Sequence, residues 1–339
     1  MKLRPYVFEI ILAVNTAWVF WTARGDAVAT MKESALNAGL NPLYATLLGI
    51  FLRFVIASFR GHGRRYLQII SNPRWWTDTI RLLVAMIFLA ETYGWIKLLV
   101  PVLHPVLYDA ALYRLDQAIF FGMSPPIFFL QLFSNSGFLR FIDQAYPNFF
   151  IAGMLFALAF FFSMPRRRVR ITFLTSSTIM WLAGAWLYML IPSLGPAFRF
   201  PDIWFPYVKG LPRTQWSQSM LMRNYHAVIR LAHGGPPEKL NLSYGVAAFP
   251  SLHVATQTQI AIWMRKWWRP GAIYFTLAAF IVFIGSMITG WHYLIDGIAG
   301  AALAFGSYAA SQWIVKKEFR PSLARFSVHA ADAGTDHAE

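Results

Sequence analysis

Long apolar runs separated by short polar segments are the dominant pattern of this chain. A membrane-spanning helix needs about 20 mainly apolar residues, and several runs approach that length. The weakest of them contains Arg53. The eight runs are Tyr6–Thr22, Leu43–Phe59, Ile80–Val102, Asn148–Met164, Ile171–Pro192, Ser251–Trp267, Gly271–Trp291 and His292–Val315. The pattern predicts an all-α fold, a multi-pass transmembrane helical bundle of about eight spans in which the last six form the core.

The composition agrees with a protein whose solvent is mostly lipid. Hydrophobic residues make up 57% of the 339 positions and charged residues 13%, whereas a soluble protein averages about 25% charged residues. The mean hydropathy is +0.45. The chain has no cysteine, which excludes a disulfide framework, cysteine-based zinc sites and cysteine nucleophiles.

The net charge of +15 gives the expected orientation. In a membrane protein, Lys and Arg first mark the cytoplasmic loops and only then contact an anionic substrate or lipid surface, so we expect no nucleic-acid partner. If the N-terminus lies inside, four densely basic segments also lie inside, namely residues 60–76, 165–170, 265–269 and 316–321. Both termini are then cytoplasmic.

Three parts of the chain follow from this pattern. Residues 1–79 form a two-span N-terminal segment with a cytoplasmic loop, residues 80–318 form the main membrane domain, and residues 319–339 form a polar tail that we expect to be disordered. The first span follows Lys2 and Arg4 without a clean small-residue cleavage site. We interpret it as a retained span, and a cleaved signal peptide is the alternative.

Two segments on the outer face are amphipathic instead of continuously apolar. Gln218–Ala232 has apolar residues at helical spacing, and Tyr108–Asn135 mixes apolar stretches with Asp109 and Asp116. Carboxylates are costly to bury alone in lipid. We therefore expect interfacial helices in both segments, with Gly122–Pro126 as the bend within the second.

A histidine lies where the sixth apolar run begins, in the stretch AAFPSLHVAT. Pro250 suits the first turn of a helix, because the N–H that it lacks is not needed there. The N–H groups of such a helix start form an anion site, and His253 would lie in that first turn at the outer face. Alone, a histidine at a membrane edge is equally well explained by an interfacial position.

A second polar pair, His292 and Asp296, begins the last run at the same face. Residues four apart share one face of a helix, so the carboxylate can fix the tautomer of the imidazole and leave its other nitrogen as a nucleophile or base. The equal depth predicted for His253 lets the three residues converge. The alternatives are a structural hydrogen bond between helix neighbours and a metal site of two histidines and one carboxylate.

The motifs PSLH, from Pro250, and GWHYLID, from Gly290, resemble two signature motifs of the type-2 phosphatidic acid phosphatase superfamily. The segments YMLIPSLGPAFRFP (Tyr188–Pro201) and, more loosely, YRLDQAIFFGMSP, from Tyr113, are similar to its inositol phosphorylceramide synthase-like branch. The resemblance covers roughly Tyr108–Gly300. It implies a phosphatase or phosphotransferase that needs no metal or other cofactor, with a six-helix catalytic core.

The resemblance also implies roles for single residues. His292 attacks phosphorus and forms a phosphohistidine, Asp296 orients and charge-balances it, and His253 protonates the leaving alkoxide and then activates the acceptor. Ser251 and the backbone N–H groups around Leu252 hold the phosphoryl oxygens. The implied partners are a lipid phosphate substrate, a hydroxyl acceptor or water, and the surrounding membrane lipids.

The chain departs from the superfamily pattern at three places. Leu252 stands where glycine is usual, Ser286 stands six residues before His292 where arginine is usual, and no clean K-x6-R-P motif precedes them. The phosphate site therefore lacks its usual cations. We expect Arg199 and Arg213, from the basic outer loop, to bind the phosphate instead.

The sequence thus predicts an integral membrane lipid phosphatase or phosphotransferase whose site opens at the extracytoplasmic face of a bacterial plasma membrane. A transporter of a lipid or anion that uses the same polar residues is the alternative, because ionisable residues within a membrane also mark transport pathways. The polar residues cluster at one face and not at the midplane, and no inverted repeat is visible. Both features favour the enzyme.

Overall fold

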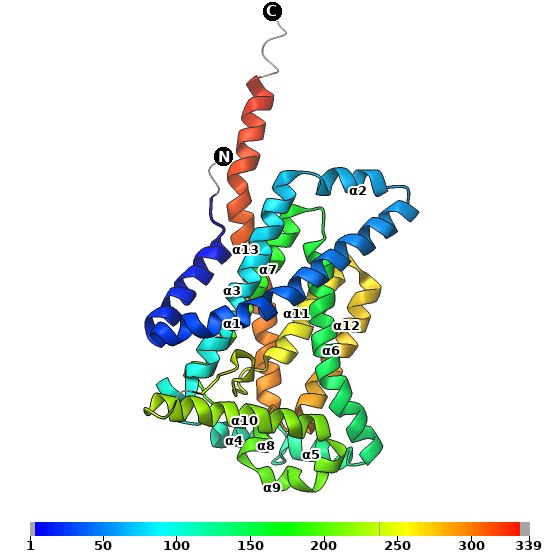
Figure 1. Ribbon diagram of the computed structural model, residues 1–339. Coiled ribbons are helices and arrows are strands. Elements are labelled where there is room, and N and C mark those ends of the chain that lie inside the picture. Colours follow the sequence, from blue (N-terminus) through cyan, green and yellow to red (C-terminus); the bar gives the residue numbers. More distant parts are fainter. Residues whose placement is uncertain (1–3, 237, 333–339) are drawn as a thin grey trace, which may run out of the picture.

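The chain folds into a bundle of helices. The computed structural model describes residues 4–236 and 238–332, and no strand occurs in these ranges. Long helices run side by side through the molecule, and short helices lie across its two ends (Figure 1). The predicted all-α, multi-pass class is confirmed.

Six helices of the described part are long and apolar enough to cross a membrane. They are Ala38–Phe59 within α1 (Val7–Phe59), α3 (Pro73–Leu103), α6 (Ser136–Phe162), α7 (Arg167–Leu190), α12 (Arg269–Ile288), and α13 (Leu294–Asp332) as far as Phe319. The other two predicted spans are shorter, Val7–Ala23 and α11 (Leu252–Trp267). α11 contacts α6, α12 and α13 and buries Gln257 and Gln259, so it is less apolar than a helix that faces lipid.

The N-terminal segment differs from the prediction of two spans joined by a loop. Val7–Phe59 is helical throughout, and it changes direction between its two limbs (Figure 1). The expected loop, residues 23–42, is rich in alanine, a strong helix former. Arg53 in the second limb donates to the Phe160 carbonyl at 2.8 Å and to the Ser163 hydroxyl at 3.0 Å, so its charge is not left without partners in apolar surroundings.

Short helices close the two ends of the bundle (Figure 1). α2 (Gly63–Ile70) crosses one end. The other end carries α4 (Asp109–Ile119), α5 (Pro125–Leu132), α8 (Pro196–Arg199), α9 (Pro201–Trp204), the 3-10 helix η1 (Phe205–Gly210) and α10 (Pro212–Ala232). A second 3-10 helix, η2 (Leu242–Tyr244), packs against α3 and α10. The helices expected in the two amphipathic segments are therefore present. Gly122 has a φ of 85° at the bend between α4 and α5, a conformation that glycine adopts without strain.

α13 is longer than the last predicted span. It continues as a helix to Asp332, into the tail that we expected to be disordered. The remainder of that tail, residues 333–339, lies outside the described residues.

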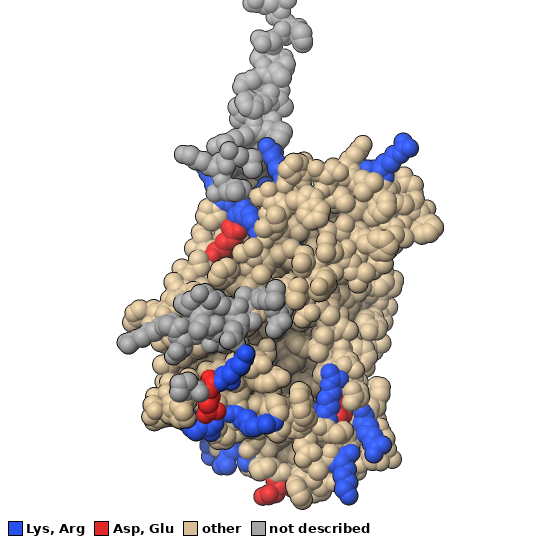
Figure 2. All heavy atoms as spheres, viewed as in Figure 1, with Lys and Arg blue, Asp and Glu red and all other residues tan. Residues whose placement is uncertain are grey.

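Charged side chains gather toward the two ends of the bundle. On the face shown in Figure 2, a broad band of uncharged side chains separates them. The four basic segments that we expected on one side of the membrane all lie toward the end that carries α2, opposite α10 (Figure 1). This distribution is typical of a membrane protein whose basic loops share one side.

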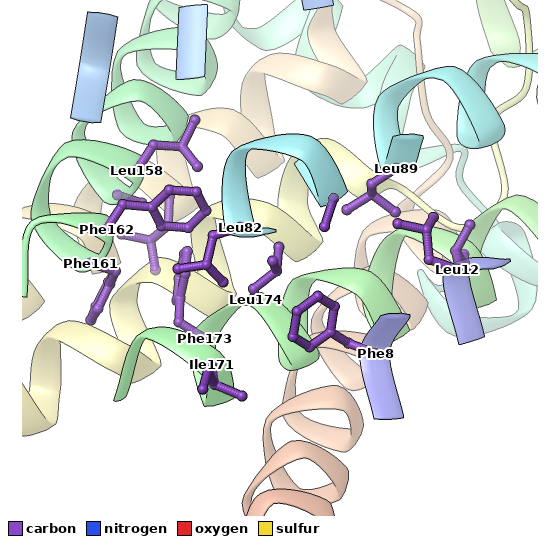
Figure 3. Packing of buried hydrophobic residues seen from close by; sticks show 14 of the residues in the cluster. Phe8, Leu12, Leu82, Leu89, Leu158, Phe161, Phe162, Ile171, Phe173 and Leu174 are labelled. Atoms are coloured by element: carbon purple, nitrogen blue, oxygen red, sulfur yellow. The ribbon is translucent and has the colours of Figure 1, made fainter. Parts of the chain in front are cut away.

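A large apolar core joins α1, α3, α6 and α7 (Figure 3). Phe161 and Phe173 stack with ring centroids 4.2 Å apart, and Trp263 of α11 meets both rings edge-on. Lipid is as apolar as these side chains, so van der Waals contact and close backbone approach hold membrane helices together more than the hydrophobic effect does.

Two glycines let helices meet at backbone distance. A Cβ on Gly49 would lie 2.0 Å from the Ala159 carbonyl oxygen, so α1 lies directly on α6. A Cβ on Gly300 would lie 2.2 Å from the Ser251 carbonyl oxygen, so α13 lies directly on the start of α11. The second contact brings together the two helix starts that carry the polar motifs.

The replacement Gly300→Ala should force α13 away from α11. Overpacking of a close contact costs about 1–3 kcal/mol, so we expect the unfolding temperature to fall by several degrees. Gly306→Ala on the same helix is the control, because nothing lies within 4 Å of a Cβ added there. Tryptophan-fluorescence melting of the detergent-purified protein measures both variants, and equal melting temperatures would contradict the close contact at Gly300.

Candidate active site

The starts of α11 and α13 lie together toward the end of the bundle that carries α10 (Figure 1). The Ser251 N–H donates to the Asp296 carbonyl at 2.9 Å, and the missing Cβ of Gly300 permits this approach. The PSLH and GWHYLID motifs, far apart in the sequence, therefore meet in the fold.

The first of these helix starts differs in detail from the prediction. Ser251 is the N-cap of α11, and its hydroxyl accepts from the Val254 N–H at 3.3 Å. Such a serine satisfies an N–H that has no partner within the helix. Pro250 therefore precedes the helix and does not occupy its first turn, which corrects our expectation. His253 does lie in the first turn, as predicted.

The second helix start corrects the expectation that His292 and Asp296 share one helix face. α13 begins at Leu294, so His292 precedes the helix. The Asp296 carboxylate reaches back over the helix start, where its Oδ2 accepts from the Tyr293 N–H at 2.8 Å and lies 3.4 Å from His292 Nδ1. That second distance is longer than an ordinary N–H···O hydrogen bond, so the two groups are neighbours without a formed hydrogen bond.

The two imidazoles face each other. His292 Nε2 lies 3.5 Å from His253 Nδ1, and the ring centroids are 5.7 Å apart. His292 is only 3% exposed, and burial, with the positive charge of Lys97, lowers its pKa to about 3. The imidazole is therefore neutral at physiological pH, the form that offers a nitrogen lone pair.

Aromatic side chains of α6 form the wall beside His253. The ring centroids of Phe150 and Tyr146 lie 4.4 and 5.4 Å from that of His253. The Tyr146 hydroxyl is buried and has no hydrogen-bond partner among the described residues. This side of the site is thus largely apolar.

Lys97 is a residue that the sequence reasoning missed. Its ammonium lies 5.3 Å from the ring centroid of Tyr188 and 5.9 Å from that of Tyr93, and its charge acts on both imidazoles of the site. It forms no ion pair within the described part of the chain. The signal was present: six residues separate Lys97 from His104-Pro105, which is the K-x6-R-P spacing with histidine in place of arginine.

The two arginines that we expected to bind phosphate have other contacts. The Arg213 guanidinium donates to the Gln144 and Asn148 side chains at 3.1 and 2.8 Å. The Arg199 guanidinium lies 5.5 Å from the ring centroid of Phe200. Their phosphate-binding roles stay predictions.

Leu252, which stands where the superfamily usually has glycine, is accommodated by a glycine on the neighbouring helix. Its side chain is buried, and a Cβ on Gly184 of α7 would lie 2.7 Å from its Cδ2. Leu252 thus fills space that α7 leaves open. The roles predicted for its backbone N–H and for Ser251 in holding phosphoryl oxygens are not tested by this packing and stay predictions.

Asp109 and Asp116, which we expected at the membrane interface, are fully buried. They are not alone, because each accepts hydrogen bonds from backbone N–H groups beside the site. A buried carboxylate is tolerated where such bonds replace its water. The burial itself was not predicted, because the sequence does not reveal which N–H groups the fold will place opposite a carboxylate.

The two histidines and Asp296 do not have the geometry of a metal site. Within residues 4–236 and 238–332, no group of three or more His, Asp or Glu side chains could hold a metal ion. His292 presents one nitrogen to His253 and the other to Asp296. The candidate ligand atoms therefore point at one another and not at a common centre.

Comparison with known proteins identifies the family. A model described as the PAP2 superfamily, the type-2 phosphatidic acid phosphatases, matches residues 110–310, which is more than half of the chain. The match includes both histidines and Asp296, excludes Lys97, and does not distinguish the branches of the superfamily. No curated protein and no solved structure matches the chain significantly. With its membrane-length helices and this match to a superfamily of phosphatases and related phosphoesterases, the chain belongs to the PAP2 superfamily.

Proposed function

We propose that the protein is an integral membrane lipid phosphatase or phosphotransferase that breaks a lipid phosphoester at His253, His292 and Asp296. The observation that carries the proposal is the pair of facing nitrogens, His292 Nε2 and His253 Nδ1, 3.5 Å apart where two helix starts meet. Membership of the superfamily supports the reaction class.

Neutral His292 is the nucleophile. Its Nε2 lone pair attacks phosphorus while the bond from phosphorus to the leaving oxygen breaks, which gives a phosphohistidine. Asp296 faces the Nδ1 side of the ring and balances the positive charge that develops there. His253 acts as the imidazolium when it gives a proton to the leaving alkoxide, and as the neutral imidazole when it then takes one from the acceptor, as the acceptor oxygen attacks phosphorus and the bond from phosphorus to His292 breaks.

The direction of attack requires the imidazoles to move. An in-line displacement places phosphorus between the attacking nitrogen and the leaving oxygen, so His292 and His253 must separate when a phosphoester binds. His253 is the more exposed of the two histidines, whereas His292 is buried, so we assign the movement to His253.

Lys97 is the cation that we assign to the phosphoryl group. Its charge acts on both imidazoles, and the tyrosine rings beneath it do not neutralise it. The N–H groups at the start of α11, around Leu252, and the Ser251 hydroxyl are the neutral donors proposed for the same oxygens. Arg199 and Arg213 are further candidates from the outer loop.

A lipid substrate suits the position of the site. His292 lies just before the start of α13, a helix long enough to cross a membrane, and His253 lies beside it, so acyl or prenyl chains can remain in the bilayer while the phosphate reaches the imidazoles. With the basic segments in the cytoplasm, both termini are cytoplasmic and the site opens at the extracytoplasmic face of a bacterial plasma membrane.

Transfer to a hydroxyl is the reaction that we favour over hydrolysis. The motifs are similar to those of the inositol phosphorylceramide synthase-like branch, and His292 is nearly inaccessible to water. An enclosed phosphohistidine is protected from water and can wait for a lipid or polyol hydroxyl.

Replacement of the nucleophile tests the proposal. His292→Ala should abolish turnover, and His253→Ala should lower it by about 10²–10⁴-fold, as expected for loss of a general acid and base. The measurement is mass spectrometry of lipids after purified protein is incubated with diacylglycerol phosphate, polyprenyl diphosphate or phosphoinositide, with and without acceptor alcohols.

The exposed histidine of α10 provides a matched control, and His226→Ala should keep full activity. In the wild-type protein, a substrate-dependent label on histidine that is acid-labile and alkali-stable should accumulate, and His292→Ala should lack it. Normal turnover by His292→Ala would remove the proposal.

Replacement of Lys97, the cation that we assign to the phosphoryl group, should change kcat/KM. Lys97→Met should lower kcat/KM by about 10–100-fold, since a charged hydrogen bond contributes about 1.5–3 kcal/mol, while Lys97→Arg should retain more activity. Lys209→Met removes an exposed cation elsewhere at the same end and controls for general attraction of anions. Equal effects of the replacements at Lys97 and Lys209 would show that Lys97 has no specific role.

A further inference from the structure

Two buried carboxylates of α4 bind backbone groups on either side of the candidate nucleophile. Asp109 and Asp116 are 1% and 0% exposed, and they lie two helical turns apart, so they project from one face of α4. Neither contacts the imidazole of His292 or His253. Their partners are N–H groups of the segments that carry or flank the site.

Asp116 closes the start of α13. Its Oδ2 accepts from the Leu294 N–H at 2.7 Å and its Oδ1 from the Ile295 N–H at 2.9 Å. These are among the first N–H groups of the helix, which have no partner within it, and a carboxylate at this end is also favoured by the helix dipole. Leu294 and Ile295 stand between His292 and Asp296 in the chain, so this bidentate contact fixes the segment that carries both.

Asp109 holds the neighbouring loop and the residue after the nucleophile. Its carboxylate accepts from the Leu194 N–H at 3.0 Å, from the Gly195 N–H at 2.9 Å and from the Tyr293 hydroxyl at 3.1 Å. α4 therefore holds two segments of the chain at once, residues 194–195 and residues 293–295.

We infer that Asp116 is a positioning residue for His292, that it acts by holding the start of α13, and that turnover falls when its carboxyl group is protonated. The inference rests on the proposed function and deepens it. Asp116 is not a catalytic residue, because it touches backbone N–H groups and not the imidazoles. A protonated carboxyl has only one good acceptor oxygen left for the two N–H groups that it now holds, so the helix start loosens.

The titration lies in an accessible pH range. Burial raises the pKa of Asp116 to about 6, against the lowering effect of the Ile295 and Leu294 N–H groups and with a further increase from Asp296. The other titratable groups around it are Tyr293 at the start of α13 and Asp109 on α4. α8, which also packs on α4, contributes Arg199, whose charge is directed at a phenylalanine ring.

Stability and activity should respond to this proton in opposite directions. A pKa raised above the unfolded value means that the folded state gains stability as pH falls through about 6, and loses it as pH rises through that value. Turnover should instead fall as pH falls through the same range. If Asp116 had only a structural role, stability and turnover would change in the same direction with pH.

The experiment compares Asp116→Asn with Asp143→Asn in the full-length protein. Asp143 is buried to the same extent and caps another helix start, where it accepts from the Thr214 N–H at 2.7 Å and the Arg213 N–H at 2.8 Å. Both replacements weaken an equivalent cap, but only the first cap belongs to α13. kcat and KM are measured on diacylglycerol phosphate in mixed micelles from pH 5 to 8.

We expect Asp116→Asn to lower kcat at least tenfold with KM within about twofold, and to lack the fall in kcat that the wild type shows near pH 6. Asp143→Asn should keep the wild-type kcat and its pH profile. Asp116→Glu keeps a titratable carboxyl, so its kcat should again fall at acid pH, with a midpoint shifted from that of the wild type. Wild-type kcat and an unchanged acid limb in Asp116→Asn would overturn the inference.

A measurement that needs no substrate separates this inference from the proposed function. Hydrogen exchange at the Leu294 and Ile295 amides should be faster in Asp116→Asn than in the wild type, and unchanged in Asp143→Asn. If the wild type turned over no lipid phosphate and formed no phosphohistidine, the proposed function would fall, yet faster exchange would still support the contact of Asp116 with α13. Unchanged exchange would refute that contact whatever the activity.

Discussion

The N–H groups at the starts of α11 and α13 need acceptors in surroundings that hold little water, and this need shapes the site. An unpaired N–H at membrane depth costs roughly several kcal/mol. Ser251, Asp296 and Asp116 supply the acceptors. Each of these side chains binds backbone next to a histidine of the site, so the bonds that close the two helices also hold the segments that carry the histidines. The N–H of Ser251 completes the arrangement by joining one helix start to the other through the Asp296 carbonyl.

Departures from the superfamily pattern are compensated by residues elsewhere in the fold. Leu252 occupies space that Gly184 leaves on α7, so a larger residue in the motif does not push α11 away. Lys97 comes from α3, outside the matched segment, and in the proposed reaction it supplies the positive charge that Ser286 does not provide. The compensation of Leu252 by Gly184 involves two helices and is not visible in a single motif, whereas Lys97 could have been found from its spacing to His104-Pro105. The site needs a filled space beside the start of α11 and a positive charge near the imidazoles, and residues of any segment can supply them.

The sequence predicted the parts of this structure that depend on local pattern. Apolar length predicted the helices, and the motifs predicted that His253, His292 and Asp296 would lie together. It did not predict that residues 23–42 are helical, because polar loops and alanine-rich helices share many residue types. It did not predict the burial of Asp109 and Asp116. Their partners are backbone N–H groups, and the sequence does not specify where the fold places these groups. The phosphate-binding roles given to residues of the outer loop stay predictions.

The net charge that the site presents to a ligand depends on which of its charged groups already have hydrogen-bond partners. Asp109, Asp116 and Asp296 would repel an anionic substrate if their charges were free, but each is directed at N–H dipoles by short charge-assisted bonds. Lys97 has only the faces of tyrosine rings as neighbours, so its charge is available to a ligand. Because electrostatic attraction is stronger where little water screens it, one such cation together with the N–H groups of α11 would suffice for the phosphate in the reaction that we propose. The carboxylates are already satisfied by N–H groups of α13 and of residues 194–195, so the positive charge of Lys97 is not cancelled by them.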